Sequence, residues 1–302
     1  MGTIPDEKQP VANPDEWNVQ RILQWSATWL KEKSTDRYSH PKLEAELLLA
    51  HVLELDRMSL YLQLDRPLSK SERDSYKILL RRRAEGEPVA YILGYRDFYR
   101  HRFVVSPAVL IPRPDTELLV ELASKAANAL EAPHILEVGT GSGCVAISLA
   151  SEVPRATVVA WDICNAALAV ASRNMQDIGV KNLTLIHRDA LELGVFEQDL
   201  FDIVVSNPPY VAKHEVELMS RETLNYEPKL ALFSSDDEGL EFYQVFATRS
   251  QKALREGGKL FLEIGLNQAA KVAQLLKDSN WRKIEIVKDL AGHDRVICAE
   301  RP

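Results

Sequence analysis

The most specific chemical pattern in the chain follows an apolar run at 201–206. It consists of Asn207, Pro208, Pro209 and Tyr210. The side-chain oxygen of Asn207 and the carbonyl oxygen of Pro208 are two acceptors that can hold both N–H bonds of one NH2 group. Neither proline ring donates a hydrogen bond, and each proline favours an extended conformation in the residue before it. We therefore predict that Asn207, Pro208 and Tyr210 are catalytic. Together with Pro209 they are predicted to bind a planar NH2 group, on which Tyr210 packs.

An amide nitrogen is a weak nucleophile because its lone pair is delocalised into the neighbouring carbonyl. Two fixed acceptors hold such an NH2 group in one orientation and raise the electron density on its nitrogen. The rate advantage then comes from alignment and preorganised dipoles, and no strong base is required. This chemistry suits transfer of a methyl group from a sulfonium to an amide or amino nitrogen. A rigid loop exit without chemical function is the alternative interpretation of the same motif.

A glycine-rich turn follows the apolar segment at 134–138 and leads into a helical pattern. Its glycines allow a tight turn and the close approach of a ligand, and the helix start offers free N–H groups. A dinucleotide site needs GxGxxG, but the third glycine is replaced here by Cys144 or Ala146, depending on the frame. The GxGxG form is common in methyltransferases and predicts a site for the methionine part of S-adenosylmethionine. A turn without a ligand is the alternative. The residues of this turn predicted to bind the cofactor are Gly139, Thr140, Gly141, Ser142 and Gly143.

Two acids stand where the next apolar segments end. Asp162 lies near the end of the segment at 157–163 and can accept hydrogen bonds from two ribose hydroxyls. Asp189 follows the segment at 183–188 and is predicted to face an adenine amino group. Either acid alone is also explained as a solvated strand-end residue. The distance from the glycine turn favours the ribose role for Asp162.

Seven short apolar segments predict the strands that must position these residues. They are HILEV (134–138), TVVAWDI (157–163), LTLIHR (183–188), FDIVVS (201–206), KLFLEI (259–264), KIEIVKD (283–289) and RVICAE (295–300). Helical patterns separate the first five, which predicts a parallel, doubly wound sheet covered on both faces. A short turn around Gly292 joins the last two, so we expect an antiparallel hairpin at one end of the sheet. The predicted fold class is α/β, with a seven-stranded Rossmann-like sheet.

Helical periodicity predicts a small bundle before this sheet. Asn13, Pro14 and Glu16 form a helix-start pattern, and Ser69 with Glu72 forms a capping box for a later helix. An aromatic and β-branched stretch follows and predicts a β-hairpin. The expected organisation is a flexible leader at 1–13, a helical domain at 14–90, a β-hairpin linker at 91–114 and a catalytic domain at 115–302.

The composition excludes several classes of protein. The 302 residues are 46% hydrophobic, which is enough for a core, and the net charge of −7 does not mark a nucleic-acid or membrane-surface binder. No apolar run approaches 18 residues, and the start of the chain lacks a signal-peptide core. Cys144, Cys164 and Cys298 form no CxxC pair, which favours a reduced, cytoplasmic protein, although a bond between the first two stays open. The seven histidines show no ligand spacing, so we expect no metal.

Three motifs give the chain a close resemblance to the HemK/PrmC family of peptide chain-release factor N5-glutamine methyltransferases. They are IPRPDTE at 111–117, EVGTGSG at 137–143 and SNPPY at 206–210, and the first is the most specific to the family. The resemblance spans nearly the whole chain. It implies a class I methyltransferase fold and transfer of a methyl group from S-adenosylmethionine to the side-chain amide nitrogen (N5) of the glutamine in a GGQ motif of a release factor.

The resemblance also implies roles for particular positions. It implies cofactor contacts from Gly139 to Gly143, at Asp162 and at Asn207, and substrate contacts from Asn207 to Tyr210. Some relatives have an aromatic residue beside the adenine where this chain has Ala190, which is therefore included among the cofactor-binding residues. The helical domain is implied to dock the release factor, and the basic stretch at 71–102 suits that role, although a solvated helix face explains its charges equally well.

Other functions remain open at this point. The nearest alternative is an N-methyltransferase acting on an exocyclic amino group of a nucleic-acid base, because such a base also presents an NH2 group. The acidic net charge and the IPRPDTE motif speak against it. A ribosomal-protein glutamine is another possible substrate, and a dehydrogenase or an inactive binding protein fits the motifs less well. We expect a monomer whose partner is a release factor, with no nucleic acid and no membrane.

Overall fold

The computed structural model describes residues 17–33, 40–193 and 199–302, and these divide into two compact units. The helical unit extends to Gly94 and also includes Ser220–Tyr226. The sheet unit comprises Tyr95–Met219 and Glu227–Pro302. The predicted leader at 1–13 and the predicted helix start at Asn13 lie outside the described residues.

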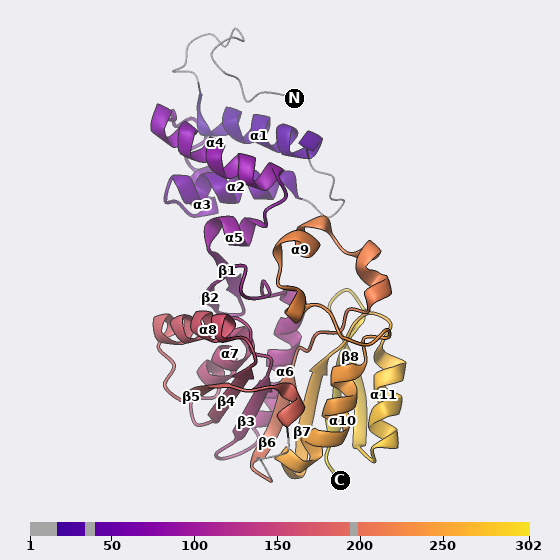
Figure 1. Ribbon diagram of the computed structural model, residues 1–302. Coiled ribbons are helices and arrows are strands. Elements are labelled where there is room, and N and C mark those ends of the chain that lie inside the picture. Colours follow the sequence, from indigo (N-terminus) through magenta and orange to yellow (C-terminus); the bar gives the residue numbers. More distant parts are fainter. Residues whose placement is uncertain (1–16, 34–39, 194–198) are drawn as a thin grey trace. The chain divides into compact units, whose positions relative to one another are not determined.

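Helices make up the helical unit, and those that precede Gly94 pack around a common core (Figure 1). They are α1 (Val19–Lys33), α2 (Pro41–Val52), α3 (Arg57–Tyr61), α4 (Lys70–Ala84), α5 (Val89–Leu93) and α9 (Arg221–Tyr226). Ile22 and Leu30 of α1 are buried in this core. The Trp25 and Trp29 rings stack on each other, with their centroids 5.8 Å apart.

The capping box predicted for the start of α4 is confirmed. The Ser69 hydroxyl accepts a hydrogen bond from the Glu72 backbone N–H at 3.2 Å, and the Glu72 carboxylate accepts one from the Ser69 backbone N–H at 2.8 Å. Two backbone donors that the helix leaves without an internal partner are thereby satisfied. The pKa of Glu72 is lowered, because its hydrogen bonds to Ser69 and the charge of Arg66 outweigh the opposing effect of burial.

Helix α9 joins the helical unit although it lies in the sequence between strands of the sheet unit. The Arg83 guanidinium, which is buried, forms ion pairs with Glu44 and with Glu222 of α9, both at 2.9 Å. The Tyr226 hydroxyl donates a hydrogen bond to the Glu85 carbonyl at 3.2 Å. Hydrogen bonds and a buried ion pair therefore fix α9 against α2 and α4.

The sheet unit contains a two-stranded antiparallel hairpin and a seven-stranded sheet whose order is β5-β4-β3-β6-β7-β9-β8. The hairpin strands are β1 (Tyr95–Phe98) and β2 (His101–Val104). The sheet strands are β3 (His134–Val138), β4 (Thr157–Asp162), β5 (Leu183–His187), β6 (Phe201–Ser206), β7 (Leu254–Glu263), β8 (Arg282–Lys288) and β9 (Asp294–Glu300). All seven predicted strands are present.

Strand β9 alone runs opposite to the others, because it pairs antiparallel with both β7 and β8. The predicted antiparallel hairpin of β8 and β9 is therefore confirmed. Its final strand inserts between β7 and β8, a placement that the sequence did not predict. The strands β3 to β6 pair in parallel around β3, with β4 on one side and β6 on the other.

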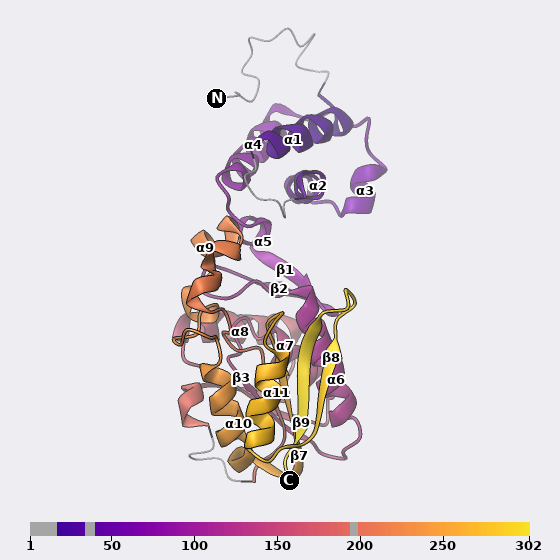
Figure 2. The same cartoon turned by 90° about the vertical axis from the view of Figure 1, so that its right-hand side faces the viewer.

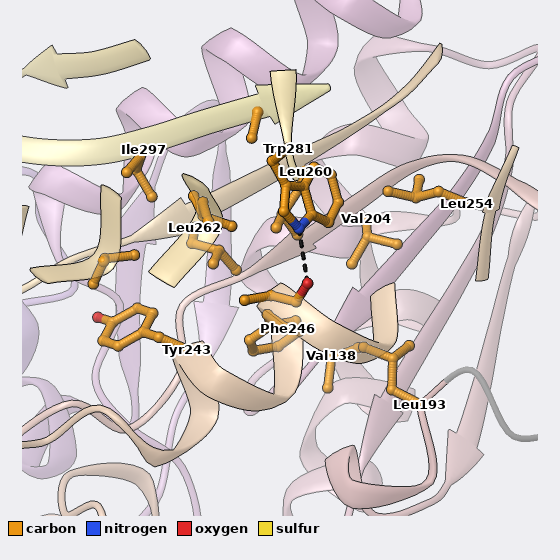
Figure 3. Packing of buried hydrophobic residues seen from close by; sticks show 14 of the residues in the cluster. Val138, Leu193, Val204, Tyr243, Phe246, Leu254, Leu260, Leu262, Trp281 and Ile297 are labelled. Atoms are coloured by element: carbon orange, nitrogen blue, oxygen red, sulfur yellow. Dashed lines mark hydrogen bonds between the residues drawn. The ribbon is translucent and has the colours of Figure 1, made fainter. Parts of the chain in front are cut away.

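Helices cover both faces of this sheet (Figure 2). One layer holds α6 (Glu117–Ala127), α7 (Cys144–Glu152) and α8 (Asn165–Ile178), and the other holds α10 (Glu241–Ala253) and α11 (Ala269–Asp278). The core beneath α10 is shown in Figure 3, where the Trp281 indole N–H donates a hydrogen bond to the Ala247 carbonyl at 2.8 Å. A sheet buried on both faces is rigid at its strand ends, which is where the polar residues lie.

Candidate functional site

A cavity of about 340 Å³ opens at the carboxyl ends of β3, β4 and β6. The strands β4 and β5 lie on one side of β3, whereas β6 and β7 lie on its other side, so the strand order reverses at β3. Open α/β sheets bind ligands at such a switch point. The predicted site residues that line it together are Gly139, Thr140, Gly141, Ser142, Asp162, Asp189, Ala190, Asn207, Pro208 and Pro209. Gly143 and Tyr210 do not line it.

The glycine turn divides into two functions. Gly139 and Gly141 have φ angles of +80° and +55°, and a Cβ atom at either position would meet no protein atom within 4 Å. They therefore leave open space on the cavity side. Gly143 has φ +82°, but a Cβ there would lie 2.8 Å from Ile147 Cδ1 and 3.2 Å from Ala171 Cβ. Gly143 therefore allows the close packing of α7 against α8, and its predicted cofactor contact stays a prediction.

Glu137 is a residue of the site that the prediction missed. Its carboxylate accepts hydrogen bonds from the Thr140 hydroxyl at 2.5 Å and from the Ala146 backbone N–H at 3.1 Å, so it holds the turn and the start of α7. Burial raises the pKa of this carboxyl to about 7. An acid inside an otherwise apolar strand is unusual and was the available signal.

Asp162 is held in place by the backbone around it. Its two oxygens accept hydrogen bonds from the Gly141 N–H at 2.8 Å and from the Cys164 N–H at 2.9 Å. Burial nevertheless raises the pKa of the carboxyl above its ordinary value. Each oxygen keeps a second lone pair for a ligand. Asp189 differs, since one of its oxygens caps the short helix at 190–192 by accepting from the Leu191 N–H at 2.8 Å.

Asn207 is oriented by a side chain from the IPRPDTE motif. Its Nδ2 donates a hydrogen bond to the Thr116 hydroxyl at 3.2 Å, and that hydroxyl donates to the Glu263 carboxylate at 2.6 Å. In the part of the chain that the structure describes, no other residue makes a hydrogen bond with the Asn207 side chain. The Asn207 Oδ1 and the adjacent Pro208 carbonyl are thus acceptors at the cavity wall.

The same motif holds the neighbouring loop. Glu227 accepts hydrogen bonds from the Ile111 backbone N–H at 3.0 Å and from the Arg113 guanidinium at 2.5 Å. Tyr210 is partly buried and packs against the apolar cluster, and burial raises the pKa of its hydroxyl. Its carbonyl accepts a hydrogen bond from the Gln268 amide at 3.0 Å. The predicted packing of Tyr210 on a substrate is therefore not visible in the cavity lining.

The part of the basic stretch at 71–102 that lies in the helical unit is partly neutralised there. Arg82 pairs with Glu87 at 2.6 Å, and Arg83 pairs with Glu44 and Glu222 at 2.9 Å. These two arginines therefore have structural partners within the helical unit.

Three further observations concern metals, cysteines and membranes. Across residues 17–33, 40–193 and 199–302, no group of His, Cys, Asp and Glu side chains has the arrangement of a metal site. The three cysteines are free thiols, so the pairing of Cys144 with Cys164 is absent. No helix in the described ranges is both long and apolar enough to cross a membrane.

The strand order, the cavity and the glycine turn define a class I methyltransferase domain, and comparison with known families agrees. Residues 114–236 match the methyltransferase small domain, and residues 21–94 match the PrmC N-terminal domain. The chain is 40% identical to the release factor glutamine methyltransferase of Chlorobaculum tepidum, over 97% of this chain and 98% of the relative. It belongs to the family of release factor glutamine methyltransferases, as the resemblance predicted.

Two more proteins show the extent of the similarity. The release factor glutamine methyltransferase of Geobacter sulfurreducens is 38% identical, over 94% of this chain and 97% of its own length. A solved structure of a release factor-specific protein-(glutamine-N5) methyltransferase from Alicyclobacillus acidocaldarius is 32% identical and has a TM-score of 0.40. That comparison covers 66% of this chain and 99% of the other.

Proposed function

We propose that this chain transfers a methyl group from S-adenosylmethionine to the N5 side-chain nitrogen of the GGQ glutamine of a peptide chain-release factor. The observation that carries the proposal is the orientation of Asn207. Its Nδ2 is engaged by Thr116, so its Oδ1 and the Pro208 carbonyl remain as a pair of acceptors at the wall of the cavity. A primary amide has the two N–H bonds that such a pair can accept.

The residues around the cavity fit S-adenosylmethionine. Gly139 and Gly141 leave room for a ligand beside the backbone, and Asp162 retains lone pairs for two ribose hydroxyls. Ala190 and Leu191 add apolar surface next to Asp189. When bound, the cofactor supplies a methyl group on a positively charged sulfur.

The protein's own residues then act on the substrate amide. Asn207 Oδ1 and the Pro208 carbonyl accept its two N–H bonds and fix the plane of the NH2 group. Fixing this plane aims the nitrogen lone pair and increases its electron density, which is a contribution of alignment and fixed dipoles. The proton released from the methylated nitrogen passes to water. We propose that the helical unit docks the release factor and that the enzyme acts as a monomer in the cytoplasm.

A methyl-transfer assay with two matched substrates tests this function. The protein is incubated with labelled S-adenosylmethionine and either a release factor or the same factor with its GGQ glutamine replaced by alanine. We expect label only in the unmodified factor, and tandem mass spectrometry should map the added methyl to the glutamine side chain. Parallel reactions contain nucleic acid or ribosomal proteins. Label confined to nucleic acid or to a ribosomal protein would overturn the proposal.

A further inference from the structure

Thr116 and Glu263 form a buried pair at the edge of the cavity, which Thr116 itself lines. Thr116 ends the short helix Pro114–Thr116, Glu263 ends β7, and both side chains are almost fully buried, with exposed fractions of 3% and 1%. The Thr116 hydroxyl lies 2.6 Å from the Glu263 carboxylate and 3.2 Å from Asn207 Nδ2. Three segments that are distant in the sequence thus meet in one line of hydrogen bonds.

The direction of this line follows from the single hydrogen of the Thr116 hydroxyl. An ionised Glu263 carboxylate is only an acceptor, so it takes that hydrogen. The hydroxyl oxygen then has only lone pairs to offer Asn207, and it accepts from Nδ2. If the Asn207 amide were turned over, Oδ1 would face the hydroxyl oxygen with no hydrogen between them. This arrangement is unfavourable for buried polar atoms.

We propose that Thr116 and Glu263 are positioning residues, which set the direction of the Asn207 amide so that Oδ1 faces the substrate NH2 group. This inference rests on the proposed function, because it concerns the acceptor of that same site. The chemistry it requires of the substrate is a donor NH2 group. A turned amide would present N–H bonds to the substrate's own N–H bonds.

The charge of Glu263 also determines the direction of the hydrogen bonds at Thr116. Burial raises the pKa of Glu263 to about 7, while the hydrogen bond from Thr116 and the charge of Arg295 oppose this rise. A protonated Glu263 can donate to the Thr116 hydroxyl, which then directs its own hydrogen to Asn207 and favours the turned amide. The charged and titratable groups that face Glu263 are Arg113, Asp115, Cys144, Tyr210, Tyr243 and Arg295.

Two substitutions of Thr116 separate the hydroxyl from the shape of the side chain. Thr116→Val keeps the volume and removes the hydroxyl, whereas Thr116→Ser keeps the hydroxyl and removes the methyl group. Because the loss is indirect, we expect Thr116→Val to lower kcat by about tenfold, less than removal of a direct contact. Thr116→Ser should restore most of this loss. The affinity for S-adenosylmethionine, measured by calorimetry, should change by less than about twofold in both.

A double-mutant cycle tests whether the effect passes through Asn207. In an Asn207→Ala background, Thr116→Val should cause no further loss of kcat, because there is no amide left to orient. Two results would overturn the inference. One is an equal loss of kcat in Thr116→Val and Thr116→Ser, and the other is a loss of kcat from Thr116→Val in the Asn207→Ala background that is as large as in the wild type. Wild-type protein that methylates no release factor would instead contradict the proposed function, so the two failures are distinguishable.

The pH dependence of kcat gives a readout that does not depend on the folding of the Thr116 variants. At saturating cofactor and release factor, kcat of the wild type should rise as pH increases through about 7, as Glu263 ionises. Glu263→Gln should remove this rise and lower kcat throughout, because its amide has no ionised form to fix the Thr116 hydrogen. A rise that persists unchanged in Glu263→Gln would contradict the role of Glu263.

Discussion

Asp162 and Asn207 each use part of their hydrogen-bonding capacity within the protein and keep the rest at the cavity. Asp162 is fixed by the Gly141 and Cys164 N–H groups, and Asn207 is fixed by the Thr116 hydroxyl. Side chains held in this way do not need to reorganise when a ligand arrives. Preorganisation of this kind lowers the cost of binding and of charge development.

Replacing Asn207 by alanine should leave the fold intact and reduce methyl transfer by about 10²-fold or more, because one of the two acceptors is lost. The measurement is kcat with a release factor as substrate, together with the midpoint of thermal unfolding. Asn182→Ala is the matched control, since the Asn182 amide donates to the Ala150 and Ala156 carbonyls and lies outside the cavity lining. That variant should lose stability, whereas its turnover when folded should stay near normal. Near-normal turnover of Asn207→Ala would contradict the mechanism.

Replacing Asp162 by alanine should mainly weaken cofactor binding. Hydrogen bonds to a charged group contribute about 1.5–3 kcal/mol, so we expect the dissociation constant for S-adenosylmethionine to rise about 10- to 100-fold. Isothermal titration calorimetry measures this change, and Asp162→Asn, which keeps one acceptor oxygen, should give a smaller one. An affinity unchanged in both variants would show that the ribose is held elsewhere.

Local sequence was sufficient to locate these polar residues but not their partners. The turn, Asp162 and Asn207 follow apolar segments, so their positions at strand ends were predictable. The contact between Thr116 and Glu263 joins positions 147 residues apart, and no local pattern predicts which strand end lies beside which loop. For the same reason the packing role of Gly143 and the packing of Tyr210 against the apolar cluster required the structure.

At the scale of elements, the apolar segments predicted all seven strands of the sheet, but helix α11 was not predicted. Of the helix expected between β5 and β6, the described residues contain only the short helix at 190–192. Other short pieces were also missed. Helices α3 and α5 contain only five residues each, which is too few for a helical period to emerge. Strand β7 begins at Leu254, whereas the sequence predicted its start at residue 259. The prediction was too late because Gly257 and Gly258 resemble a turn in the sequence. Strand β9 inserts between β7 and β8 through backbone pairing, which side-chain patterns do not encode.

The two kinds of glycine in the turn should respond differently to alanine. Gly143→Ala combines left-handed strain with a Cβ placed 2.8 Å from Ile147 Cδ1, so we expect it to lower the free energy of unfolding by about 2–5 kcal/mol. Gly141→Ala adds a Cβ in open space, so the strain alone should lower it by about 1–2 kcal/mol. Urea denaturation measures both. Calorimetry should show that Gly141→Ala also weakens cofactor binding, and equal stabilities of the two variants would contradict the packing role of Gly143.

At the scale of the whole molecule, two buried acids influence how stability depends on pH. Burial raises the pKa of Glu137 and of Glu263 from the ordinary value of 4.5 to about 7. Between these values the folded state binds more protons than the unfolded state. The free energy of unfolding should therefore decrease as pH rises from about 4.5 to about 7, and the contribution of these groups should then level off.

Urea denaturation of the ligand-free protein between about pH 5 and about pH 8 measures this trend. Glu137→Gln should make the decrease shallower, because it removes one of the two titrating groups. Glu121→Gln, at an exposed position of α6, is the control and should leave the slope unchanged. Stability that increases steadily from about pH 5 to about pH 7 would contradict the assignment.

The inclusion of α9 in the helical unit has a consequence for modularity. This unit combines the residues up to Gly94 with Ser220–Tyr226, so it is discontinuous in the sequence. A fragment with the boundaries 21–94 of the matching domain family lacks Glu222, one of the two acids that pair with Arg83. Simple gene fusion or truncation at residue 94 therefore cannot transfer the complete unit to another enzyme. Substitutions in the helical unit must therefore remain compatible with the segment at 220–226, which follows the SNPPY motif.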